Sequence, residues 1–187
     1  MPTFRNISLQ SMVLISGLAA ILGFNNAAAQ AIPFSQHGSV SQRVGLTDIK
    51  IEYNRPVARG RVLFGPDGLV KFGSIWHPGA DSASYISFSR AVVLEGKSVP
   101  KGEYSIWLMP QASGPWTLIL SKAARVFHQP YPGPEQDLLR VPVTPATGSH
   151  MEVMAFYFPV VARDSAVLHL HWGTRIVPIQ IKAPLDP

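Results

Sequence analysis

The sequence predicts an all-β domain, built as an antiparallel β-sandwich or a jelly roll. Short segments alternate between apolar and polar residues, and turn residues separate these segments. The chain also has 17 prolines in 187 residues, which leave few stretches long enough for a helix. There is no cysteine to form a disulfide, so packing of the apolar residues, 47% of the chain, must stabilise the domain.

Two segments show the alternation most clearly. Residues 48–53 place Ile49, Ile51 and Tyr53 on one face and charged side chains on the other, as in a strand with one solvated side. Residues 85–89 repeat this pattern. Three further segments are predicted as more fully buried strands, at residues 91–94, 104–109 and 116–120. The remaining predicted strands are residues 138–143, 153–158, 167–172 and 175–181.

Turn-forming residues lie between these segments. They occur at residues 66–68, 95–97, 100–102, 113–115 and 163–164. Residues 130–134 can only form a loop because three of them are proline. The sole helical candidate is residues 121–127, and neither an internal repeat nor a second domain is visible.

The N-terminal residues have the features of a secretory signal peptide. Arg5 precedes an apolar run over residues 12–24, and small residues follow at 27–29. A helix over this run would be about 20 Å long, which is too short for a hydrocarbon core of roughly 30 Å. We therefore expect the segment to be removed, which leaves no stable membrane anchor.

Cleavage is predicted after Ala29, with Ala31 as the near alternative. The predicted organisation is then a signal peptide at residues 1–29 and a β-sandwich domain at residues 30–187, in the periplasm or secreted. Because no cysteine is present to carry a lipid, the chain is not expected to be a lipoprotein.

The charge pattern argues against nucleic acid as a partner. The net charge of +5 results from a shortage of acidic residues, and no segment has a cluster of Lys and Arg. The motifs G-x-S-x-G and H-E-x-x-H are also missing, as is a glycine loop for phosphate. We therefore assign no catalytic residue and expect no cofactor.

Several short motifs, in order along the chain, carry a resemblance to a known family. They lie at Gln42 and Gly45, residues 53–61 with 63–65, residues 76–81 with 83–84, and residues 100–105. Over residues 39–181 they resemble the exported bacterial domain-of-unknown-function family 2911. Its pattern is Tyr-x-Arg-Pro, Gly-Arg, Trp-Arg-x-Gly-Ala-Asn-x-x-Thr and Gly-x-Tyr-Ser. The resemblance implies an exported β-domain and no particular reaction.

Three residues depart from that pattern. His77 replaces an arginine, Asp81 replaces an asparagine and Ser84 replaces a threonine. If the family shares a ligand, its contacts differ here, because an imidazole replaces a permanent cation and a carboxylate replaces an amide.

The candidate ligand-binding residues are Arg55, Arg61, Trp76, His77 and Asp81. Arginine presents a planar set of donors that suits an anion or sugar hydroxyls, and Trp76 precedes a turn, where it could line a pocket. The sequence thus predicts a binding or interaction module for a small anionic or sugar-like ligand, with no known partner protein. In the simpler alternative, the two arginines pair with Asp81 or with backbone carbonyls and fix their loop.

Two other functions stay open at this point. One is a hydrolase or lyase that uses His77 with Asp81 or Tyr85, although proximity in sequence does not provide catalytic geometry. The other is a structural envelope protein that has no small ligand and pairs an edge strand with a partner.

The spacing of two histidines is compatible with a metal site, but the sequence does not predict one. His169 and His171 place two imidazoles on one strand face. A hairpin turning at residues 163–164 would set His169 opposite Tyr157 and leave His150 farther along the strand. Since zinc needs a third converging ligand, we expect no metal.

Overall fold

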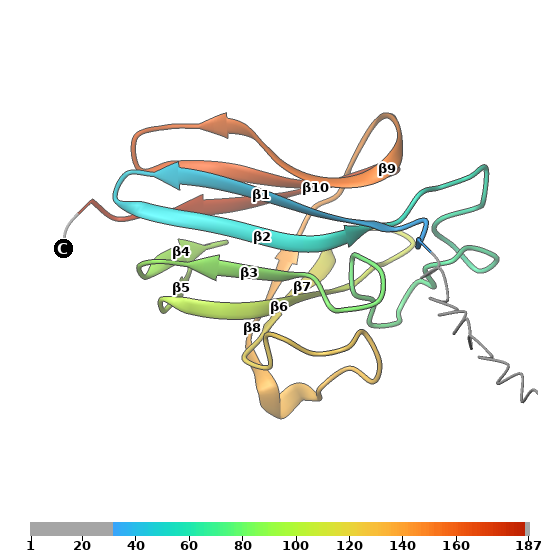
Figure 1. Cartoon of the computed structure of the whole chain (residues 1–187), viewed down its shortest axis with the longest axis horizontal. Helices are drawn as coiled ribbons and strands as arrows, with labels where there is room; N and C mark the ends of the chain where they lie inside the picture. Colours follow the sequence, from blue (N-terminus) through green and yellow to red (C-terminus); the bar gives the residue numbers. More distant parts are fainter. Residues whose placement is uncertain (1–31, 186–187) are drawn as a thin grey trace, which may run out of the picture. The chain divides into compact units, whose positions relative to one another are not determined.

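The computed structural model describes residues 32–185, which fold into two antiparallel β-sheets and their connections (Figure 1). The predicted all-β sandwich class is confirmed. The strands are β1 (Gln36–Val44), β2 (Thr47–Arg55), β3 (Tyr85–Phe88), β4 (Val92–Leu94), β5 (Lys97–Val99), β6 (Gly102–Met109), β7 (Trp116–Ser121), β8 (Asp137–Val143), β9 (Ala146–Val161) and β10 (Ser165–Lys182).

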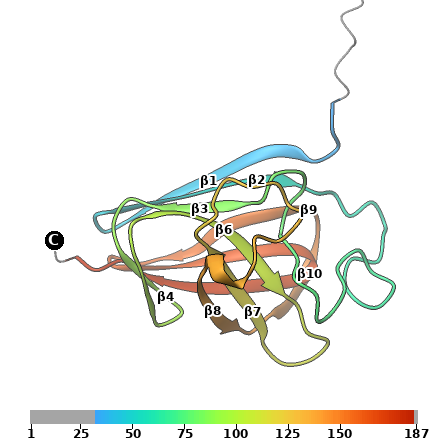
Figure 2. The same cartoon turned by 90° about the horizontal axis from the view of Figure 1, so that it is seen from below.

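The larger sheet has six strands in the order β1-β2-β3-β6-β7-β8, and the smaller has four in the order β5-β4-β10-β9. A long segment connects β2 to β3 beyond the end of β2 (Figure 1). A second connection joins β7 to β8 and lies over β6 when the domain is seen from below (Figure 2). These two connections form the candidate site described below.

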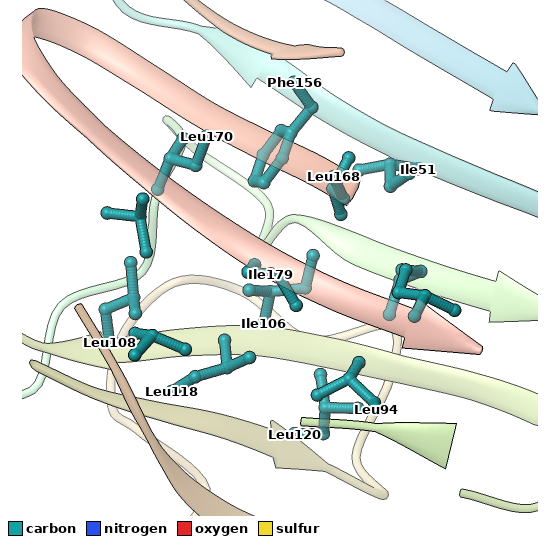
Figure 3. Close-up of a cluster of buried hydrophobic side chains, with 14 of the residues drawn as sticks. Ile51, Leu94, Ile106, Leu108, Leu118, Leu120, Phe156, Leu168, Leu170 and Ile179 are labelled. Carbon is teal, nitrogen blue, oxygen red and sulfur yellow. The ribbon is translucent and has the colours of Figure 1, made fainter. Parts of the chain in front are cut away.

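The main core lies between the sheets. Alternation sends Ile49 and Ile51 of β2 inward, where both are fully buried. Figure 3 shows side chains of β10 meeting those of the larger sheet, among them Leu168 opposite Ile51 and Ile179 opposite Ile106. The apolar side chains at every second position of these strands therefore pack into the core between the two sheets.

The predicted helix at residues 121–127 is wrong. Strand β7 continues to Ser121, and the residues after it follow an irregular path. The described residues contain no α-helix, and their one short 3₁₀ helix is η1 (Pro134–Gln136), beside the proline-rich loop. Proline at its first position is compatible with a helix start, because its missing N–H would have no partner there.

The segments predicted as separate strands at 167–172 and 175–181 form one strand, β10. Gly173 lies between them with φ of 55°, and the pairing with β9 shifts on either side of it. A residue in the left-handed conformation can form a bulge within a strand. The strand therefore continues through Gly173, where the sequence pattern suggested a break between two strands. Farther along the hairpin, His169 pairs with Tyr157 as predicted.

Strands β1 and β5 were not among the predicted segments. Both are edge strands, with exposed polar residues that weaken the alternation. The signal peptide predicted at residues 1–29 lies outside the described residues. The described residues from Pro33 onward form one compact unit. In the described part of the chain, no helix has the length and apolar character needed to cross a bilayer.

Candidate functional site

The outer face of the six-stranded sheet, which points away from the smaller sheet, has its own apolar cluster. Trp107 of β6 and Ile119 of β7 pair across the strands on this face, and both are buried. They pack with Ala83 from the β2–β3 connection and with Val126 and Tyr131 from the β7–β8 connection. The two connections therefore cover part of a sheet face that would otherwise be solvated.

Backbone hydrogen bonds hold the β2–β3 connection against β6. Trp76 exchanges two bonds with Leu108, at 2.7 and 2.8 Å, and the Ser84 carbonyl accepts a bond from the N–H of Ile106 at 2.8 Å. The chain between them therefore returns to the same strand edge. This return brings His77 beside Trp107, with 5.9 Å between the ring centroids.

A cavity of about 410 Å³ opens between the two connections. We call it the histidine cavity. Its lining includes Trp76, His77, Asp81, Trp107, His128 and Tyr131. A cavity of this volume falls within the range of small-molecule sites in proteins.

His77 is a buried polar group of this cavity, with only 6% of its surface exposed. Its Nε2 atom has no hydrogen-bond partner within the described part of the chain. Burial lowers the pKa of His77 from 6.5 to about 4, and the nearby His128 adds a smaller effect in the same direction. A contact with the backbone of Ser82 opposes both. At neutral pH the ring is therefore uncharged.

Gly79 allows the tight packing around His77. A side chain here would begin 2.9 Å from Nε2 of His77 and 2.6 Å from Oγ of Ser84. That hydroxyl donates a 2.6 Å hydrogen bond to the Pro78 carbonyl, so it has little freedom to move. Only glycine fits beside these two buried side chains.

His128 stacks on His77 and joins the two connections. The two imidazole centroids are 5.2 Å apart, with 20° between the ring planes. Nδ1 of His128 donates a 2.5 Å hydrogen bond to the Asp81 carbonyl, which also accepts one from the His128 backbone at 3.0 Å. In a neutral ring with its proton on Nδ1, Nε2 of His128 is an acceptor.

Asp81 carries the acidic side chain of this cavity, and it is exposed. Its φ of 61° lies in the left-handed region, which aspartate and asparagine tolerate better than most residues. The structure shows no carboxylate within hydrogen-bond distance of His77 among residues 32–185, so the geometry of a histidine–aspartate catalytic pair is not present there.

The two predicted arginines bind backbone carbonyls. Nε of Arg55 donates to the Met154 carbonyl at 3.0 Å, toward the smaller sheet. Nε and an Nη of Arg61 donate to the carbonyls of Ala58 and Val57 at 2.9 and 2.6 Å. Neither arginine lines the histidine cavity. These contacts correspond to the alternative in which the arginines fix their loop.

The two predicted stretches nevertheless meet. Nδ2 of Asn54, the neighbour of Arg55, donates a 3.0 Å hydrogen bond to the Ala80 carbonyl. Trp76 borders the histidine cavity, but its ring packs against Trp172 and Phe64, with centroid distances of 6.2 and 5.7 Å. The structure therefore groups His77 and Asp81 and turns the Trp76 ring away into the apolar core.

Tyr85, the other partner considered for His77, lines a second cavity on the same outer face. The candidate residues chosen from the sequence did not include Trp107, His128 and Tyr131. The β7–β8 connection is rich in aromatic residues, histidine and proline, which could have drawn attention to it. Nothing in the sequence, however, indicates that this connection folds over β6.

His169 and His171 both bind the hydroxyl of Tyr157, at 3.3 and 3.2 Å. Nε2 of His171 also donates to the Ser149 carbonyl at 3.0 Å. In residues 32–185, no group of three or more His, Asp or Glu side chains could hold a metal ion. These imidazoles therefore form a hydrogen-bond network on the outer face of the smaller sheet.

Taken together, the fold and the site define a two-sheet β domain with a small-molecule-sized cavity outside its main core. The family model described as "Protein of unknown function (DUF2911)" matches residues 35–181, so the chain belongs to this family. No curated protein and no solved structure matches the chain.

Proposed function

We propose that this protein binds a small, neutral, hydroxyl-rich ligand of the sugar type in the histidine cavity. The observation that carries the proposal is the composition of the lining. Trp107 and Tyr131 supply aromatic rings, while Asp81, His128 and Gln129 supply donors and acceptors. Sugars offer the matching surfaces, since an apolar ring face alternates with hydroxyls that donate and accept.

The charges favour a neutral ligand over an anion. The lining includes the carboxyl group of Asp81 but no lysine or arginine, and His77 is neutral at pH 7. The guanidinium of Arg140, which binds Tyr131 of the lining at 3.1 Å, is already paired with Asp137 at 2.6 Å. An anion would meet a carboxylate here without a free cation to compensate.

Isothermal titration with glucose, N-acetylglucosamine, maltose, inorganic phosphate and citrate tests the proposal. We expect a saccharide to bind, and Asp81→Asn to weaken that binding about tenfold or more through loss of a charge-assisted hydrogen bond. Asparagine keeps the left-handed backbone, so the melting temperature should change little.

Asp67→Asn, in the exposed turn at residues 66–68, is the matched control and should bind like wild type. Binding of phosphate or citrate with no saccharide response would contradict the proposal. So would a saccharide response that Asp81→Asn leaves unchanged.

We also propose that the chain is exported to the periplasm or beyond, after cleavage behind Ala29. The apolar run at residues 12–24 and the small residues after it support this. Mass spectrometry of the protein recovered from a periplasmic extract should give a chain that begins at Gln30, or at Ile32 if Ala31 is the cleavage site. An intact chain retained in the cytoplasm would contradict export.

A further inference from the structure

A second cavity, of about 390 Å³, lies on the same outer face of the six-stranded sheet. We call it the tyrosine cavity. Its lining includes His37, Glu52, Asn54, Tyr85, Arg125 and Phe127. These side chains come from β1, β2, β3 and the β7–β8 connection, so the larger sheet forms its floor and the connection forms a wall.

The two cavities both border one pair of bridged residues. Ser82 and Phe127 form this bridge and line the tyrosine cavity, while their neighbours Asp81 and His128 line the histidine cavity. Consecutive residues are about 3.8 Å apart. The linings therefore meet at this bridge, which we call the ridge, and Asn54 of one cavity binds the Ala80 carbonyl of the other at 3.0 Å.

The charges around the tyrosine cavity are balanced. Arg125 binds both carboxylate oxygens of Glu103 at 2.7 and 2.8 Å, and its guanidinium lies 4.4 Å from the Tyr85 ring centroid. Glu52 forms an ion pair with Lys50. Because each charge has a partner, this cavity also suits a neutral ligand that makes hydrogen bonds.

Phe127 forms an exposed aromatic surface on the ridge. Its side chain lines the tyrosine cavity, and 59% of its surface is exposed. Its ring centroid is 4.4 Å from that of His128. A large apolar ring between two polar cavities is a suitable surface for the apolar face of a sugar.

We infer that the two cavities are subsites for one oligosaccharide, which crosses the ridge over Phe127. The inference rests on the proposed function, because it extends the ligand of the histidine cavity to at least two linked sugar units. A chain that fills both cavities gains contacts without a second loss of translational freedom, so its affinity should rise with length.

Titration of the ¹⁵N-labelled protein with N-acetylglucosamine and glucose oligomers of one to four units tests the inference. We expect one unit to shift the indole signal of Trp107, and longer oligomers to shift the Arg125 side-chain signal as well, with an affinity gain of about tenfold or more. Phe127→Ala should remove most of this gain, measured as the ratio of the four-unit to the one-unit affinity of the same variant. Phe34→Ala, which removes another exposed ring, is the control and should keep the gain.

Three results would overturn the inference. Affinity independent of length, with shifts confined to the histidine cavity, would refute the shared ligand and leave the proposed function intact. Shifts at Arg125 alone, for every length, would make the tyrosine cavity a separate site and would contradict the proposed function too. Binding of an unrelated extended peptide at both cavities, in place of any saccharide, would refute both.

Discussion

Replacing Trp107 with alanine is expected to lower the free energy of unfolding by about 3–5 kcal/mol, the usual cost of removing a buried tryptophan. Trp107 lies on the outer face of the larger sheet, yet only 2% of its surface is exposed. Its Nε1 donates a 2.8 Å hydrogen bond to Ser105, and its ring contacts Tyr131 edge-on at 5.2 Å. The alanine variant would leave a void beneath both connections.

Urea unfolding monitored by circular dichroism measures this loss. Thr117→Ala is the matched control, because Thr117 lies on the same face of β7, two residues before Ile119, and is only half-buried. Its unfolding free energy should stay within about 0.5 kcal/mol of wild type. A cost below about 1 kcal/mol for Trp107→Ala would mean that the connections do not cover this face in solution.

The same residues show how far the sequence predicts the fold. Segments 104–109 and 116–120 are apolar at odd and even positions alike, which correctly indicates strands buried on both faces. One face packs against the smaller sheet. The covering of the other face could not be predicted, since residues 122–131 and the β2–β3 connection have no periodic pattern.

The position of Arg55 was predictable in part. It has the same parity as Ile49, Ile51 and Tyr53, and alternation therefore turns it toward the smaller sheet, where it binds a carbonyl of β9. His77 and Asp81 were identified from their unusual residue types. Their stacking and hydrogen-bond partner, His128, lies far along the chain, and only the tertiary fold brings it to them.

The stability of the protein is expected to fall as the pH decreases from about 6.5 to about 4, with His77 contributing about 3 kcal/mol to the loss. Burial holds the pKa of His77 near 4 in the folded chain, against 6.5 when exposed. Above pH 6.5 the ring is neutral in both states, so its contribution is fully present. Between the two values the unfolded chain binds the proton more readily, which favours unfolding.

His77→Phe separates this effect from the other groups that titrate at low pH. Phenylalanine retains a ring beside Trp107 and His128 but binds no proton, so the loss of unfolding free energy between pH 6.5 and 4 should be about 3 kcal/mol smaller than in wild type. Urea unfolding at several pH values provides the comparison. Ser84→Ala, which changes a buried neighbour without removing a titratable group, should keep the wild-type slope. If the slopes of wild type and His77→Phe coincide, the imidazole of His77 is solvated in the folded protein, which contradicts its buried position beside Trp107.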